Sequence, residues 1–180
     1  MKAISKIFGL MLTIAVAFSS CGGDDDNGDG KSEYTLKDAI CKYSHDLGIA
    51  SAGAQTITLQ TTTNLDDMLK GYDYVAPITG GTMNLTKVTS IEIVGLKEGV
   101  VLQKFSLTIN GVTKEFGDIT TAKIELYNDV NLEYFKNVFN TMVSQKKLIV
   151  SATFTPSSKI TDADALKVNF AFNGNFTYRK

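Results

Sequence analysis

An alternation of apolar and polar residues in the second half of the segment 100–109 constrains the fold of this chain more than any other feature. From Phe105 to Ile109 every second residue is apolar, and the residues between them are polar. This period of two is typical of a β-strand with one buried face. Asn110-Gly111 follows directly and favours a type I′ turn, because both central residues of that turn need a positive φ. A second strand begins at Val112, so the sequence predicts a tight β-hairpin.

The same alternation recurs along the chain and predicts the fold class. In residues 165–178, the apolar residues Leu166, Val168 and Phe170 fall on one face, and Gly174 is expected to mark a β-bulge. Other strands are expected at residues 55–62, 85–95, 112–116, 121–127 and 147–156. Short strands separated by turns that contain Gly and Asn favour a mainly β fold. We expect an antiparallel two-sheet β-sandwich of the immunoglobulin-like kind.

Two segments show helical spacing instead. Apolar residues three or four apart from Leu132 to Met142 predict an amphipathic crossover helix over residues 131–143, with Asn131 as its cap. Near the start of the domain, the apolar residues Leu36, Ile40, Tyr43 and Leu47 are spaced by four, three and four. This spacing predicts a helical N-terminal segment over residues 32–47.

The region between residues 64 and 81 is expected to be irregular. Residues 64–69 predict a short helical turn with Asn64 as its cap and Gly71 after its end. Residues 71–81 contain Pro77 and a pair of glycines, which predict a loop. Two tyrosines, Tyr72 and Tyr74, lie in this loop, and with Pro77 they form a candidate ligand-binding loop. The alternative is that the tyrosines pack against one end of the sandwich.

Chain length and charge limit the classes of partner. Residues 32–180 amount to about 150 residues, which is enough for a single domain with a hydrophobic core. The whole chain has 18 Lys and Arg residues and 19 Asp and Glu residues. Four of the acidic residues precede residue 31, so the domain has almost no net charge. Nucleic acid is therefore not an expected partner, because domains that bind it are strongly basic.

The first 20 residues have the pattern of a signal peptide. Lys2 and Lys6 form a short basic start, and the 12 residues from Ile7 to Phe18 carry no charge. A helix that crosses a bilayer needs about 20 apolar residues, so this run is too short to span one. It fits the apolar region of a secretory signal peptide. We therefore expect residues 1–20 to be removed on export.

The residues around Cys21 indicate how the exported chain is held. Phe18-Ser19-Ser20-Cys21 resembles a bacterial lipobox, although Leu, Val or Ile is usual where Phe18 stands. Gly22 and Gly23, followed by Asp24, Asp25 and Asp26, resemble the acidic export tag of surface lipoproteins of the Bacteroidota. The resemblance implies lipidation of Cys21, an outer-membrane location and exposure at the cell surface. Residues 21–31 are then a flexible acidic tether.

Two further groups of residues raise the question of a metal or catalytic site. Cys41 and His45 share a face of the expected helix, as a nucleophile with its base or as two metal ligands would. The alternative is that Cys41 is buried and His45 is solvated. Asp25, Asn27 and Asp29 match part of a calcium loop, but Leu36 stands where the bidentate Glu is required. We therefore expect no metal site, no cofactor and no catalytic residue.

The remaining motifs point to a binding role. The chain has no P-loop, G-x-S-x-G, H-E-x-x-H or dinucleotide fingerprint. We expect a non-enzymatic binding or accessory protein on the membrane, with an outer-membrane protein or a glycan as its partner. The alternatives are a pilus-type structural subunit or adhesin domain, or a hydrolase of unrecognised type that uses carboxylates. The carboxylates considered for such a hydrolase are Asp73, Asp118, Asp129, Asp162 and Asp164.

Overall fold

Two antiparallel sheets of five strands each make up most of the structure, a computed structural model that describes residues 32–85, 91–124 and 129–180. The signal peptide, Cys21, the aspartates of the export tag and the partial calcium loop lie outside the described residues. All the described elements belong to one compact unit, Lys31–Lys180. Within the described ranges, no helix is long and apolar enough to span a bilayer.

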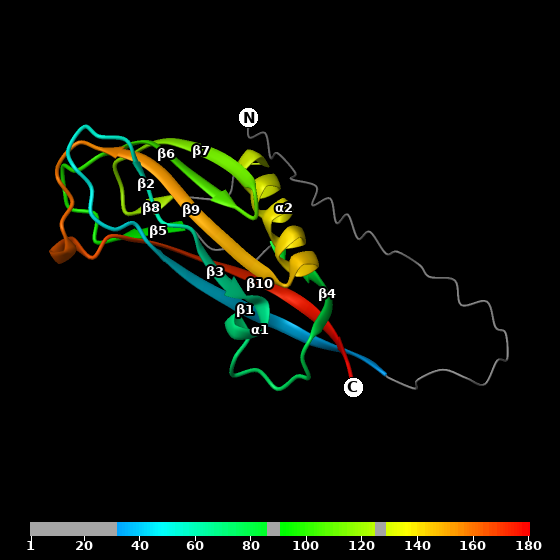
Figure 1. Ribbon diagram of the computed structural model, residues 1–180. Coiled ribbons are helices and arrows are strands. Elements are labelled where there is room, and N and C mark those ends of the chain that lie inside the picture. Colours follow the sequence, from blue (N-terminus) through cyan, green and yellow to red (C-terminus); the bar gives the residue numbers. More distant parts are fainter. Residues whose placement is uncertain (1–31, 86–90, 125–128) are drawn as a thin grey trace, which may run out of the picture. The chain divides into compact units, whose positions relative to one another are not determined.

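The first sheet has the strand order β1-β10-β5-β8, and β4 also pairs with β10 (Figure 1). Its strands are β1 (Glu33–Asp46), β4 (Ile78–Met83), β5 (Ile91–Val94), β8 (Lys123–Ile124) and β10 (Lys167–Arg179). The second sheet has the order β2-β9-β6-β7, and β3 also pairs with β9. Its strands are β2 (Thr56–Ile57), β3 (Thr61–Asn64), β6 (Leu102–Ile109), β7 (Val112–Ile119) and β9 (Lys147–Pro156). The mainly β, two-sheet fold is confirmed.

The core lies between the two sheets and follows from strand periodicity. In β9 the buried residues are Leu148, Val150, Ala152, Phe154 and Pro156, which alternate with half-buried neighbours. Because side chains alternate between the two faces of a strand, each strand sends one row of side chains into the core. The largest fully buried side chains are phenylalanines from both sheets and from helix α2.

The predicted hairpin is confirmed as β6 and β7. Asn110 and Gly111 have φ values of 48° and 80°, the positive values that a type I′ turn requires. Asn110 has a second role, because its side chain joins the turn to β9. Its Nδ2 donates to the carbonyl of Lys147 at 3.0 Å, and its Oδ1 accepts from the Ile149 N–H at 2.7 Å.

The prediction of a helical N-terminal segment over residues 32–47 is wrong. Residues 33–46 form the longest strand, β1, which pairs with β10 from Glu33↔Arg179 to Asp46↔Lys167. Its inward row is Ala39, Cys41, Tyr43 and His45, every second residue. Because this row includes a small side chain, a thiol and an imidazole, it does not stand out in the sequence as an alternation of apolar and polar residues. The long pairing with β10 outweighs the helical spacing, because strand preference depends strongly on tertiary context.

The crossover helix is confirmed as α2 (Asp129–Gln145), which connects β8 of the first sheet to β9 of the second (Figure 1). Because the helix begins at Asp129, Asn131 lies in its first turn and is not the cap. The Tyr134 hydroxyl donates to the Leu107 carbonyl at 3.1 Å, and Phe139 packs against Phe172 and Phe176. The helix therefore contacts both sheets.

Gly174 is not the bulged residue. The extra residue is in β1, where the register shifts between Leu36 and Ala39 and Asp38 has a φ of 53°. Gly174 is paired on both sides, with Ala39 and with Met83. A Cβ atom at Gly174 would lie 2.8 Å from the ring of Phe139 and 2.8 Å from the carbonyl oxygen of Thr82. The glycine is required by the close approach of both α2 and the β4 backbone to β10.

Two smaller boundaries also differ from the expectations. The strand expected at residues 55–62 is divided into β2 and β3, and the loop expected at residues 71–81 becomes β4 from Ile78 onward. The short helical turn is confirmed as α1 (Leu65–Met68), preceded by Asn64. The strand expected at residues 121–127 is described only as β8, because residues 125–127 lie outside the described ranges.

Candidate functional site

An open groove of about 450 Å³ lies on the first sheet, over strands β1, β5 and β10. The described residues that line it are Lys42, Tyr43, Ser44, Glu92, Asn169, Phe170 and Ala171. In these strands the inward rows include Tyr43 and Phe170, which belong to the core. Lys42, Ser44, Glu92 and Asn169 occupy the alternate positions, so their side chains lie on the outer face of the sheet.

Strand register brings polar side chains from four strands into one row. Ser44 pairs with Asn169, Asn169 pairs with Glu92, and Glu92 pairs with Lys123. Neighbouring strands are about 4.8 Å apart, so the row from Ser44 to Glu92 spans roughly 10 Å. Lys42, two residues from Ser44 on β1, extends the groove alongside this row. The groove therefore combines a hydroxyl, an amide, a carboxylate and an ammonium group.

Asn169 is the central side chain of this row. Its Oδ1 is shielded from solvent and has no hydrogen-bond partner within the described part of the chain. A buried acceptor that makes no hydrogen bond costs a protein about 1–3 kcal/mol. A bound molecule can supply the missing donor once the Asn169 side chain turns its amide toward the groove, because Oδ1 is shielded from solvent in the unbound chain. Asn169 therefore marks the centre of the candidate site.

A second polar group lies inside the domain, at the side where β1 faces β2 and β3. His45 is 1% exposed, with its Nε2 atom 2.6 Å from Thr58 Oγ1 and its Nδ1 atom 3.0 Å from Thr61 Oγ1. The Ala152 N–H donates to Thr58 Oγ1 at 2.8 Å, so the Thr58 hydroxyl joins the His45 ring to the backbone of β9. The hydroxyl of Tyr43 is also hydrogen-bonded to Thr61. These contacts connect the edge of the first sheet to the second sheet.

The structure separates Cys41 from His45. Both side chains point into the core, but four residues along a strand span about 13 Å, compared with about 6 Å along a helix. Cys41 is fully buried, and burial raises the pKa of its thiol to about 12. The thiol therefore stays protonated at neutral pH, and the thiol is a poor nucleophile. Among the described residues, no group of three or more His, Cys, Asp or Glu residues is placed to hold a metal ion.

Burial of His45 predicts a loss of stability in mild acid. Burial lowers the pKa of His45, and the nearby Asp46 carboxylate opposes this shift in part. In the unfolded chain His45 takes up a proton near pH 6.5, whereas in the folded chain it stays neutral at that pH. The free energy of unfolding is therefore highest above pH 6.5 and falls as the pH is lowered. For one proton, the free energy of unfolding cannot change by more than about 1.4 kcal/mol per pH unit. Urea unfolding at pH 7.5 and 5.5 should show this loss, and a His45→Gln variant should show less of it. An equal pH dependence in the variant would contradict the role of His45.

The tyrosines of the candidate ligand-binding loop make separate contacts with the domain. The Tyr72 hydroxyl accepts a hydrogen bond from the Ile40 N–H at 2.9 Å. The Tyr74 hydroxyl donates to Asp66 Oδ1 at 2.9 Å, and burial raises the pKa of Tyr74. Pro77 is exposed at the end of the loop. These contacts match the alternative in which the tyrosines pack at the end of the sandwich, and a sugar-binding role for this loop stays a prediction.

The carboxylates considered for a hydrolase are spread over four segments of the domain. Asp118 is in β7 and accepts a hydrogen bond from the Lys104 N–H at 2.9 Å. Asp162 and Asp164 belong to a short 3-10 helix, Asp162–Asp164, before β10. The ion pair with Lys97 and hydrogen bonds from Thr161 lower the pKa of Asp164 to about 2. Asp73 is in the loop before β4, and Asp129 begins α2.

No family model, curated protein or solved structure matches this chain. The function therefore has to be inferred from the chemistry of the site. Sequence reasoning did not single out Lys42, Ser44, Glu92 or Asn169. The polar positions of a half-buried strand are usually only a solvated face, and residues 42 and 44 were assigned to a helix. The unpaired Oδ1 of Asn169 and the alignment of Ser44, Asn169 and Glu92 across three strands are visible only in the structure.

Proposed function

We propose that this chain is a lipoprotein, anchored in the outer membrane through Cys21 and exposed at the cell surface, that binds a neutral glycan in the groove of the first sheet. The observation that carries the binding role is the unpaired, buried Oδ1 of Asn169 at the centre of a polar row. The resemblance of residues 18–26 to a lipobox with an export tag supports the location.

The chemistry of the groove suits a sugar. Each sugar hydroxyl both donates and accepts hydrogen bonds, so it needs both kinds of partner. Lys42 and Ser44 offer donors, and Glu92 and Asn169 offer acceptors. Among the residues that line the groove, one ammonium (Lys42) and one carboxylate (Glu92) balance in charge, which favours a neutral ligand over an anionic one. Lys123, at the end of the row, is not a lining residue. The volume lies within the range of about 300–1,000 Å³ that is usual for sites of small ligands.

Asn169→Ala should separate binding from stability. Removal of an unsatisfied acceptor should leave the free energy of unfolding unchanged or raise it by about 1 kcal/mol. The same change should weaken glycan binding about tenfold, which corresponds to about 1.4 kcal/mol. The measurements are urea unfolding and calorimetric titration with neutral oligosaccharides, selected first on a glycan array. Asn137→Ala, on the exposed face of α2, is the matched control.

The proposal has clear contrary outcomes. If Asn169→Ala destabilises the domain and leaves glycan binding intact, Asn169 is a structural residue and the groove is not the site. If none of the neutral oligosaccharides on the array binds the wild-type domain, the ligand class is wrong. If the oligosaccharides are cleaved during the titration, the protein is an enzyme and the purely binding role fails.

A further inference from the structure

The chain enters and leaves the domain at the same end. The Lys180 N–H donates to the carbonyl of Ser32 at 3.2 Å, and Glu33 pairs with Arg179. Figure 1 shows the C-terminus beside the start of β1. Only 11 residues, Cys21 to Lys31, separate this end from the cysteine that we propose to be acylated. A Gly-rich linker of that length has a root-mean-square span of about 18 Å. This end of the domain is therefore the part that the anchor holds near the bilayer.

That end carries a cluster of aromatic side chains. Tyr34 stacks on Tyr178 with their ring centroids 5.6 Å apart, and Tyr74 meets Tyr178 edge-on at 5.9 Å. Tyr34 is 45% exposed, and Val75, in the loop beside Tyr74, is 40% exposed. We call Tyr34, Tyr74, Val75 and Tyr178 the tyrosine end of the domain.

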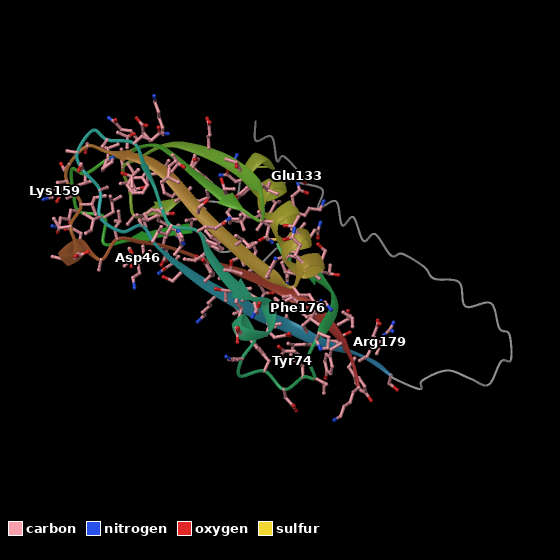
Figure 2. All side chains as sticks on the ribbon, viewed as in Figure 1. Asp46, Tyr74, Glu133, Lys159, Phe176 and Arg179 are labelled. Carbon is pink, nitrogen blue, oxygen red and sulfur yellow. The ribbon has the colours of Figure 1, made fainter. Side chains whose placement is uncertain are left out.

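Charged side chains accompany these aromatic residues. Arg179 and Lys180 are exposed next to Tyr178, and Arg179 also pairs with the exposed Glu33 carboxylate at 3.8 Å. Figure 2 shows Tyr74 and Arg179 toward the same end of the domain. Tyr side chains combine an apolar ring with a polar hydroxyl and are enriched at membrane–water interfaces. Lys and Arg near a bilayer are attracted to anionic headgroups. The tyrosine end thus has the composition of a surface that contacts lipid headgroups.

We propose that the tyrosine end docks on the headgroup layer of the membrane that holds the anchor, an inference that rests on the lipidation of Cys21. Docking would point the groove away from the bilayer. Ser44 lies 11 residues from Glu33 along β1, which corresponds to about 35 Å. The domain then acts as a spacer that presents the groove beyond the lipid surface.

The test uses the absence of tryptophan from this chain. A single tryptophan introduced by Val75→Trp reports on the tyrosine end. Ile49→Trp is the matched control, because Ile49 is 58% exposed just beyond the opposite end of β1. The acylated protein is reconstituted into vesicles of phosphatidylethanolamine and phosphatidylglycerol, with and without brominated acyl chains. Val75→Trp should emit at a shorter wavelength and lose intensity to the brominated lipid, and Ile49→Trp should do neither.

Each outcome supports or overturns the docking. If both variants give the same emission and quenching in vesicles, the tyrosine end does not dock. If Val75→Trp is shielded only in native outer membranes and not in pure lipid, the surface binds a membrane protein and the lipid partner is wrong. Tyr34→Trp, an aromatic replacement at the same end, repeats the test if Val75→Trp does not fold. Failure of the wild-type protein to fractionate with membranes would instead contradict the lipid anchor itself, independently of the docking.

Discussion

Replacing Cys21 with alanine is expected to transfer the protein almost completely from the membrane fraction to the soluble fraction. The reason is that the Cys21 thiol is the proposed acylation site. Each buried CH₂ group contributes about 0.8 kcal/mol, so several acyl chains hold a protein far more firmly than one. The measurement is membrane fractionation followed by immunoblotting. Cys41→Ala is the matched control, because Cys41 is fully buried in the domain and should not affect anchoring. A Cys21→Ala protein that stays with the membranes would contradict the lipoprotein assignment.

The three aspartates after Cys21 can be tested separately from the anchor. Changing Asp24, Asp25 and Asp26 together to asparagine should leave the protein lipidated but facing inward. Three adjacent like charges repel one another and stay solvated, so a signal for export is a better role for them than folding. Protease treatment of intact cells distinguishes the two orientations. If the triple variant is digested as fast as the wild type, the export-tag interpretation is wrong.

Gly174→Ala is expected to cause the largest loss of stability of any glycine-to-alanine change in the β4–β10 pair. The new Cβ would lie 2.8 Å from the Thr82 carbonyl oxygen, which belongs to the backbone of β4 and cannot rotate away. It would also lie 2.8 Å from the ring of Phe139 in α2. Inserting a methyl group into a packed core typically costs 1–3 kcal/mol, so we expect about 3 kcal/mol here. Urea unfolding measures the difference.

A second glycine in the same strand pair provides the control. A Cβ at Gly80 would meet only the hydroxyl of Thr177, at 2.7 Å, and this side chain can rotate. Gly80→Ala should therefore cost less than about 1 kcal/mol. Adding Phe139→Leu to Gly174→Ala should recover part of the loss, because the two sites are in contact. A Gly174→Ala domain as stable as wild type would show that α2 does not pack closely on β10.

The parts of the fold that the sequence predicted correctly depend on local signals. Asn110-Gly111 specifies a turn that needs positive φ at two adjacent residues, whatever the rest of the chain does. The alternation in β9 and β10 and the helical spacing in α2 are visible because their buried residues are strongly apolar. Such patterns place a segment in a strand or a helix before any partner is known.

The N-terminal segment was misassigned because its pattern is ambiguous. Leu36, Ile40 and Tyr43 fit a helix, whereas the buried side chains in the structure include Ala39, Cys41 and His45. The strand conformation of β1 depends on pairing with β10, more than 120 residues away along the chain. Gly174 was misread for a similar reason, since what requires a glycine there is the ring of Phe139 on another element.

The sequence by itself determined the hairpin, most of the strands and the crossover helix, because residues close together in the chain set these features. The export and anchoring signals are also linear patterns, and they remain predictions from residues 1–31. Only the tertiary structure decided that β1 is a strand and that His45 is buried against Thr58 and Thr61. It also decided the candidate site. Strand register alone places Ser44, Asn169 and Glu92 in one row, and no local signal links positions so far apart in the chain.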